Sequence, residues 1–187
     1  KLGFNCEEIS RFTNSPEILS GRVKTLHPKI HAGILSQRKL RSHKNDLKKN
    51  NYDEIDLVIV NFYPFEKTLQ KTKNHKKIIE NIDIGGPTMV RAAAKNYNDV
   101  TVITNISQYE NLIDNLNENK GATSLEFRKK TAHEAFGETA YYESLIYNYF
   151  NNFEPNNFSK RIVLGLNRIE KLRYGENPHQ EGAVYAS

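Results

Sequence analysis

The chain has 187 residues, of which 37% are hydrophobic and 26% are charged, with a formal net charge of +5. One cysteine excludes an intrachain disulfide, and the absence of any apolar run of membrane-spanning length excludes a membrane helix in the sequence given. We therefore expect a soluble, cytoplasmic protein with no membrane partner. The modest positive charge suits phosphorylated small molecules as well as nucleic acid.

The first third of the chain predicts three regular elements among loops. Residues 4–9 are typical of a short strand, and residues 10–35 of a loop with short helical turns, because Pro and Gly interrupt them. Residues 40–51 are polar and lysine-rich, which predicts an exposed helix. Residues 55–60 form a nearly continuous apolar run, which predicts a strand buried on both faces of a parallel sheet.

The remaining chain alternates helices and strands. We expect helices over 74–82, from Pro87 onward, over 107–119 with Ser107 as N-cap, and over 124–152, and a buried strand over 99–104. The apolar stripe of the longest helix should run through Phe136, Ala140, Leu145 and Tyr149. A polar linker at 151–160 precedes strands and turns. This order predicts an α/β fold with a mainly parallel sheet flanked by helices.

Residues 20–35, SGRVKTLHPKIHAGIL, concentrate positive charge that does not suit a hydrophobic core. In an extended segment Arg22 and Lys24 point to the same side, and Thr25 adds a hydroxyl group. Arginine binds phosphate through its planar fork, and lysine supplies a point charge. The segment predicts an anion site, with a solvated basic loop as the alternative.

A second cluster is Asp83-Ile84-Gly85-Gly86-Pro87-Thr88. Two glycines let a ligand approach the backbone, and a helix that begins at Pro87 would turn free N–H groups and a positive dipole end toward an anion. Asp83 is placed to neutralise a cation or to accept a proton. The alternative is a glycine turn that caps an amphipathic helix.

Asn61 and Tyr63 follow the predicted strand at 55–60. Ligands of parallel α/β sheets bind beyond the carboxyl ends of the strands, so both residues are candidates for a binding pocket, and a simple strand-end turn is the alternative. His27 and His31 lie four residues apart, but no third metal ligand is evident. We predict no metal site.

Four segments occur in one order along the chain: GRVKTLHPKIHAGIL, VNFYPFEKT, IDIGGPTMVRAAAKN and LRYGENPHQ. Together they resemble the AICAR formyltransferase/IMP cyclohydrolase family of bifunctional purine biosynthesis enzymes. The resemblance implies a methylglyoxal-synthase-like IMP cyclohydrolase domain over 1–158, N-terminally truncated. It implies a linker and the first strands of an AICAR transformylase domain over 159–187.

The resemblance also implies two activities for the parent protein. The cyclohydrolase closes formyl-AICAR to IMP with loss of water and needs no cofactor, and the transformylase moves a formyl group from 10-formyltetrahydrofolate to AICAR. The implied partners are these purine ribonucleotides and a second copy of the chain in a homodimer, with no nucleic acid. Because family segments that grip the phosphate are missing before Lys1, we expect the 187-residue chain to be inactive by itself.

Site residues follow from the same resemblance. The implied catalytic residues are Lys24, Tyr63, Asp83 and Lys95. The implied substrate-binding residues are Arg22, Thr25, Asn61, Gly85 and Gly86. The opening motif of the transformylase domain would supply Arg173, Tyr174, Asn177 and His179.

Two other functions remain open at this point. A methylglyoxal-synthase-like lyase that eliminates phosphate from a triose phosphate would share the fold, but it would leave the LRYGENPHQ segment unexplained. A basic RNA-binding module would instead show a steep fall of affinity with salt concentration.

Overall fold

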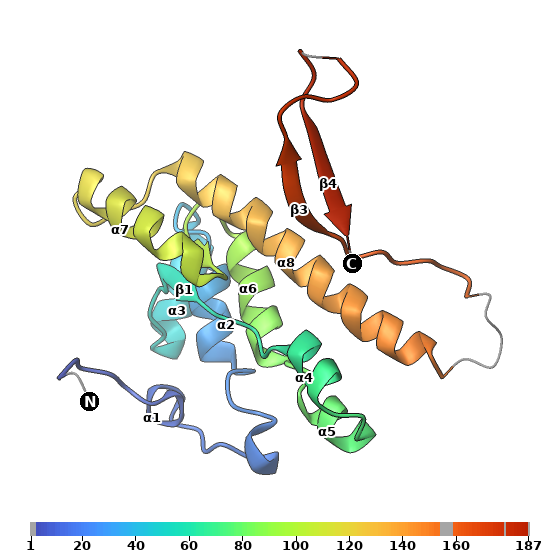
Figure 1. Cartoon of the computed structure of the whole chain (residues 1–187). Coiled ribbons are helices and arrows are strands. Elements are labelled where there is room, and N and C mark those ends of the chain that lie inside the picture. The colour runs from blue at the N-terminus through green and yellow to red at the C-terminus, as the bar shows by residue number, and fades with distance from the viewer. Residues whose placement is uncertain (1–2, 154–158, 178, 187) are drawn as a thin grey trace.

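The structure is a computed structural model that describes residues 3–153, 159–177 and 179–186 (Figure 1). Its first third contains α1 (Ile9–Thr13), the 3₁₀ turn η1 (Leu19–Gly21), α2 (Pro28–Leu35) and α3 (Arg41–Asn50). The exposed helix and short helical turns are confirmed, but residues 28–35 form a regular helix, α2, where the sequence predicted mostly loop. The strand expected over 4–9 is wrong, because the chain is irregular up to Glu8. Phe4 is exposed, and among the described residues no strand pairs with this segment.

A parallel strand pair lies at the centre of the helical body. β1 (Leu57–Ile59) pairs with β2 (Thr101–Ile103), with Leu57 opposite Thr101. All of β2 is buried, as the sequence predicted, but Leu57 and Ile59 remain 36% and 45% exposed. The expectation that 55–60 is buried on both faces is therefore wrong for β1, because the described residues cover only its Val58 face.

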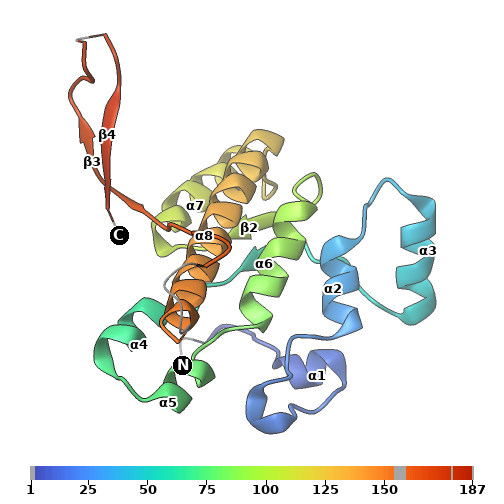
Figure 2. The same ribbon diagram turned by 90° about the vertical axis from the view of Figure 1, so that its right-hand side faces the viewer.

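α6 (Gly85–Lys95) lies between α2 and α8 (Leu125–Asn151), as Figure 2 shows. Its buried residues include three consecutive alanines, Ala92, Ala93 and Ala94, whose small side chains let both neighbouring helices approach closely. The helix begins two residues earlier than expected, so Pro87 occupies its third position and not its first. α4 (Phe65–Lys71) and α5 (His75–Glu80) connect β1 to α6.

α8 begins where the sequence predicted, since the Ser124 hydroxyl accepts a hydrogen bond from the Phe127 N–H at 3.1 Å. Its predicted apolar stripe is half wrong. Phe136 and Ala140 are exposed, whereas Leu145 and Tyr149 pack against the cluster around Phe65. The buried face carries mostly small or polar residues, which an apolar-periodicity argument overlooks: Thr131, Ala132, Ala135, Thr139, Tyr142 and Ser144.

The helix expected over 107–119 is confirmed as α7 (Tyr109–Glu118), but Ser107 does not cap it. A short 3₁₀ turn, η2 (Ile106–Gln108), precedes it, and the Asn105 side chain accepts the Ser107 N–H at 2.9 Å. Ser107 is therefore inside the turn and is not the N-cap. Asn105 thus caps the 3₁₀ turn, and α7 itself follows Gln108, whose side chain makes no capping hydrogen bond to that helix.

Residues after α8 form a hairpin that projects from the helical body (Figures 1 and 2). β3 (Asn167–Leu172) pairs antiparallel with β4 (Gly182–Ala186), which confirms the strands and turns expected here. Part of the predicted linker, 154–158, lies outside the described residues. The described segment before β3 lies along α8, where the Tyr147 hydroxyl donates to the Arg161 carbonyl at 2.6 Å.

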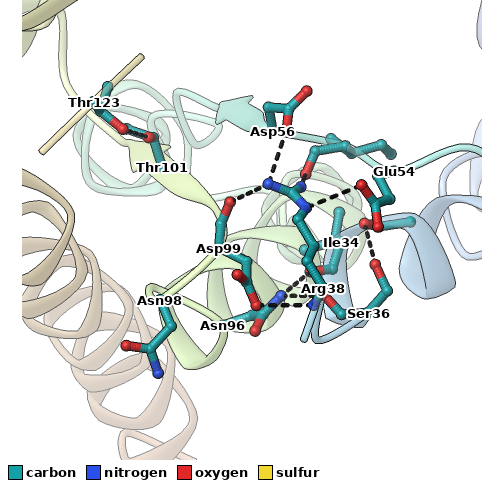
Figure 3. Close-up of polar contacts among 12 residues, drawn as sticks. Ile34, Ser36, Arg38, Glu54, Asp56, Asn96, Asn98, Asp99, Thr101 and Thr123 are labelled. Atoms are coloured by element: carbon teal, nitrogen blue, oxygen red, sulfur yellow. Dashed lines mark hydrogen bonds and ion pairs between the residues drawn. The ribbon is translucent and has the colours of Figure 1, made fainter. Parts of the chain in front are cut away.

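A polar cluster ties the end of α2 to both strands (Figure 3). Arg38 donates to the carbonyls of Ile55 and Asp99 and forms an ion pair with Asp56 at 2.9 Å. Asn96, just after α6, donates to the carbonyls of Ile34 and Ser36 at 2.8 and 2.9 Å. Because these bonds satisfy backbone groups of three separate loops, the cluster fixes α2 relative to α6.

Candidate functional site

One cavity of about 580 Å³ collects most of the predicted site residues. It lies between the loop before α2, the segment after β1 and the turn from α5 into α6. Seven residues that the sequence singled out line it: Arg22, Lys24, Thr25, Tyr63, Asp83, Gly85 and Gly86. They come from three segments that are distant in the sequence.

A tight turn presents the two cations. Ile18 and Val23 pair as an antiparallel bridge, and Leu19, Ser20 and Gly21 between them adopt positive φ angles of 54°, 56° and 90°. Such angles suit Gly21 but are strained for leucine and serine, and strain of this kind concentrates at functional sites. The reversal brings Arg22 and Lys24 onto the wall of the cavity.

Both cations are paired with carboxylates of the chain. Lys24 Nζ lies 2.9 Å from a Glu17 oxygen, and Arg22 forms an ion pair with Glu80. Hydrogen bonds that Lys24 and Arg22 donate to these carboxylates raise the pKa values of both cations, and the bond from Arg22 lowers the pKa of Glu80. The side chains are about half exposed, so each pair contributes little to stability. The sequence prediction of an anion site did not foresee these internal anions.

Asp83 lies two residues before the first residue of α6. Its Oδ1 accepts the Gly86 N–H at 3.0 Å, and its own N–H donates to the Tyr142 hydroxyl at 2.8 Å. An aspartate in this place caps the helix and complements its positive end. The free N–H groups predicted to face a ligand anion are thus partly satisfied by the chain itself.

Gly85 and Gly86 are required by close contacts within the chain. A Cβ atom on Gly85 would overlap the Thr25 hydroxyl, and one on Gly86 would overlap the Asp83 carboxylate and lie 3.1 Å from Val60 Cγ1. The glycines were predicted to admit a ligand. In the structure they admit Thr25 and Asp83, both of which line the cavity.

Other predicted residues lie elsewhere. Asn61 is exposed and donates to the Tyr109 hydroxyl at 3.2 Å, outside the cavity lining. Lys95 is the last residue of α6, so about 15 Å of helix separates it from Gly85. Arg173, Tyr174, Asn177 and His179 lie in the β3–β4 loop of the projecting hairpin (Figure 1).

The two histidines near the cavity serve the local fold. His27 Nδ1 accepts the Lys29 N–H at 3.1 Å and caps α2. Burial lowers the pKa of His31. In the part of the chain that the structure describes, no three potential metal-binding side chains gather in one place. None of its described helices combines the length and apolarity needed to cross a membrane.

Three residues at the site were missed by sequence reasoning. Glu17 and Glu80 pair with the cations, and Tyr142, which is 4% exposed, holds the Asp83 backbone. Glu80 is 58 residues from Arg22, so no local pattern links them. Tyr142 carried no signal beyond helical periodicity.

Two family models match the chain. The AICARFT/IMPCHase bienzyme model matches residues 93–187, and the MGS-like domain model matches residues 1–88. A crystal structure titled "Crystal structure of ForH" superposes with a TM-score of 0.69 at 30% identity, covering 79% of this chain and 77% of that chain. This similarity agrees with the predicted parallel sheet flanked by helices.

Curated relatives carry the name bifunctional purine biosynthesis protein PurH. The protein of Rippkaea orientalis is 48% identical over an alignment of 187 positions, which covers 98% of this chain and 36% of the relative. The protein of Bradyrhizobium diazoefficiens is 45% identical over 185 residues, covering 99% of this chain and 35% of the relative. The chain thus spans about a third of the length of these relatives. The four motifs predicted this kinship, and the chain belongs to the AICARFT/IMPCHase bienzyme family.

Proposed function

We propose that the cavity at the start of α6 binds the purine ribonucleotide on which the cyclohydrolase acts, and that a full-length protein containing this chain closes formyl-AICAR to IMP with loss of water. One observation carries the proposal. Two cations, a hydroxyl, a phenol and a carboxylate converge on one cavity from three distant segments, through Arg22, Lys24, Thr25, Tyr63 and Asp83.

The reaction suits these side chains. The carboxamide nitrogen of formyl-AICAR attacks the formyl carbon of the same molecule, so the protein mainly orients the ligand and moves protons. In our assignment Asp83 accepts the amide proton, and Lys24 stabilises the oxyanion that develops on the formyl oxygen. Asp83 returns its proton to this oxyanion, and Tyr63 donates a second proton to the resulting hydroxyl, so that the C–O bond breaks and water leaves. The formamide N–H gives its proton to the Tyr63 phenolate as the C=N bond of the new ring forms. Arg22 and Thr25 hold the nucleotide.

Further parts of the proposal rest on the family resemblance alone. Lys95 as a catalytic residue and Asn61 as a binding residue belong here, because both lie outside the cavity lining. So do the transformylase role of the hairpin loop with 10-formyltetrahydrofolate as cosubstrate, the homodimer and the cytoplasmic location. The domain division after residue 158 is also a proposal, supported by the projection of the hairpin from the body.

The test uses full-length protein containing this chain and follows conversion of formyl-AICAR to IMP. We expect Asp83→Asn to lower kcat by about 10²-fold or more while the protein stays folded, because asparagine can still cap α6 but cannot accept the proton. Asp46→Asn on exposed α3 removes the same charge and should leave kcat unchanged. Equal turnover of the Asp83 variant and the wild type would refute the assignment.

The MGS-like match over residues 1–88 supports a second candidate, a lyase that eliminates phosphate from a triose phosphate. The two functions separate in one assay. Release of inorganic phosphate from a triose phosphate, with no conversion of formyl-AICAR, would favour the lyase. A basic RNA-binding module would be recognised by a steep dependence of RNA affinity on salt.

A further inference from the structure

Glu80 is the last residue of α5 and lines the same cavity as Arg22. Its carboxylate engages Arg22 on one edge of the guanidinium group, with Oε2 3.4 Å from Nε and Oε1 in contact with Nη2. Two parallel N–H···O contacts on one edge are also the way in which arginine binds a phosphate group. The chain therefore places a carboxylate on the donors that a phosphorylated ligand needs.

We propose that Glu80 is a specificity-determining residue that competes with the ligand phosphate for Arg22. This inference rests on the proposed nucleotide site. In the free protein the Glu80 carboxylate neutralises Arg22, and a ligand binds Arg22 by replacing that carboxylate. A phosphate dianion gains from the exchange because it carries more charge than the carboxylate it displaces. A ligand without phosphate gains nothing at this position.

Two observations make the exchange feasible. The side chains of Arg22 and Glu80 are 63% and 48% exposed, and ion pairs this exposed are weak enough to be replaced. Glu80 also ends a short helix beside the turn into α6, so its carboxylate can move into solvent when a ligand binds. The second pair differs, because Lys24 has three N–H donors and can bind a ligand while it keeps Glu17.

A different role for Glu80, that of holding Arg22 in the orientation needed by the ligand, makes the opposite prediction. The experiment measures binding of IMP and of inosine to full-length protein containing this chain, by calorimetry at low salt. Glu80→Gln should tighten IMP binding by about two- to fivefold and leave inosine binding unchanged. Glu118→Gln, at the exposed end of α7, makes the same charge change away from the cavity and should alter neither ligand.

Arg22→Ala completes a double-mutant cycle, since the effect of Glu80→Gln on IMP should vanish when Arg22 is absent. Weaker or unchanged IMP binding by Glu80→Gln overturns the inference, whereas weakening by Arg22→Ala still supports the nucleotide site. If Arg22→Ala binds IMP as well as the wild type does, or the wild type binds none, the nucleotide site itself fails and the inference with it. A shift of the Arg22 Nε–H resonance on Glu80→Gln reports the pair without any ligand, and its absence also overturns the inference.

Discussion

Asp83 has a structural task beside its proposed chemical one. Its carboxylate caps α6 through the Gly86 N–H, and its own N–H is held by the buried hydroxyl of Tyr142 from α8. The same hydroxyl donates to the Asn81 carbonyl at 3.4 Å. A side chain of α8 thus determines where the Asp83 carboxylate stands at the wall of the cavity.

Tyr142→Phe should lower the free energy of unfolding by about 1–2 kcal/mol, because it leaves the Asp83 N–H without its partner. Urea denaturation measures the change. Tyr147→Phe removes a hydroxyl that bonds an exposed carbonyl of the segment before β3, so its effect should be clearly smaller. Equal losses in the two variants would contradict the role given to Tyr142.

Tyr142 also predicts how the stability of the protein depends on pH. Burial, as the largest cause, raises the pKa of Tyr142 above its ordinary value of 10.0, so the folded state holds the phenolic proton more tightly than the unfolded state does. The stability that this provides is present below about pH 10 and is lost as pH rises through the folded-state pKa. Tyr142→Phe should reduce this alkaline loss in denaturation curves between pH 9 and about 11.

At the scale of elements, the glycines of α6 and α8 give opposite predictions. Gly86→Ala should destabilise the protein by about 1–3 kcal/mol, since the new methyl group would overlap the Asp83 carboxylate. Gly137→Ala on α8 should stabilise it by about 0.5–1 kcal/mol, because nothing lies within 4 Å of the added Cβ and alanine is the better helix former. Thermal unfolding of both variants is the measurement, and a stabilising Gly86→Ala would contradict the contact.

The polar cluster around Arg38 joins elements that sequence order does not bring together. Its side chain is 22% exposed and satisfies two backbone carbonyls, so Arg38→Ala should cost about 2–4 kcal/mol of unfolding free energy. Arg38→Lys should recover only part of this, because lysine lacks the planar fork. Lys39→Ala, on the exposed neighbour, should stay within about 0.5 kcal/mol of the wild type. Chemical denaturation of the three variants is the measurement. Full recovery of the unfolding free energy by lysine would contradict the role given to the planar guanidinium group.

At the scale of the whole molecule, the cavity and the hairpin are separate structures. The cavity lies in the helical body, whereas the loop with Arg173, Tyr174, Asn177 and His179 stands at the far end of a projecting hairpin (Figure 2). The cavity and the hairpin loop thus share no described residue.

This separation predicts independent activities. In a full-length protein, His179→Ala should reduce formyl transfer to AICAR and leave conversion of formyl-AICAR to IMP unchanged, because the cavity does not include the hairpin. Tyr63→Phe should have the reverse pattern, with slower cyclisation and unchanged formyl transfer. The two assays run on each variant provide the measurement, and a parallel loss of both activities in either variant would contradict the separation.

Local patterns by themselves determined most elements of this protein. The apolar run of β2, the helical pattern of α8 and the polar surface of α3 are local features, so their elements were predicted with nearly correct bounds. The four motifs likewise identified the family. Burial on both faces of β1 and the stripe of α8 were mispredicted, because burial depends on which elements pack alongside and periodicity does not report that.

Only the tertiary structure decided which charged groups meet. Arg22 and Glu80, or Asp83 and Tyr142, are distant in the chain and are brought within hydrogen-bond reach by the packing of α5, α6 and α8. The sequence indicated that the 20–35 segment needs an anion, but it did not indicate that the chain supplies carboxylates of its own. Pairing of charges depends on distances of a few ångströms, and those distances exist only in the folded molecule.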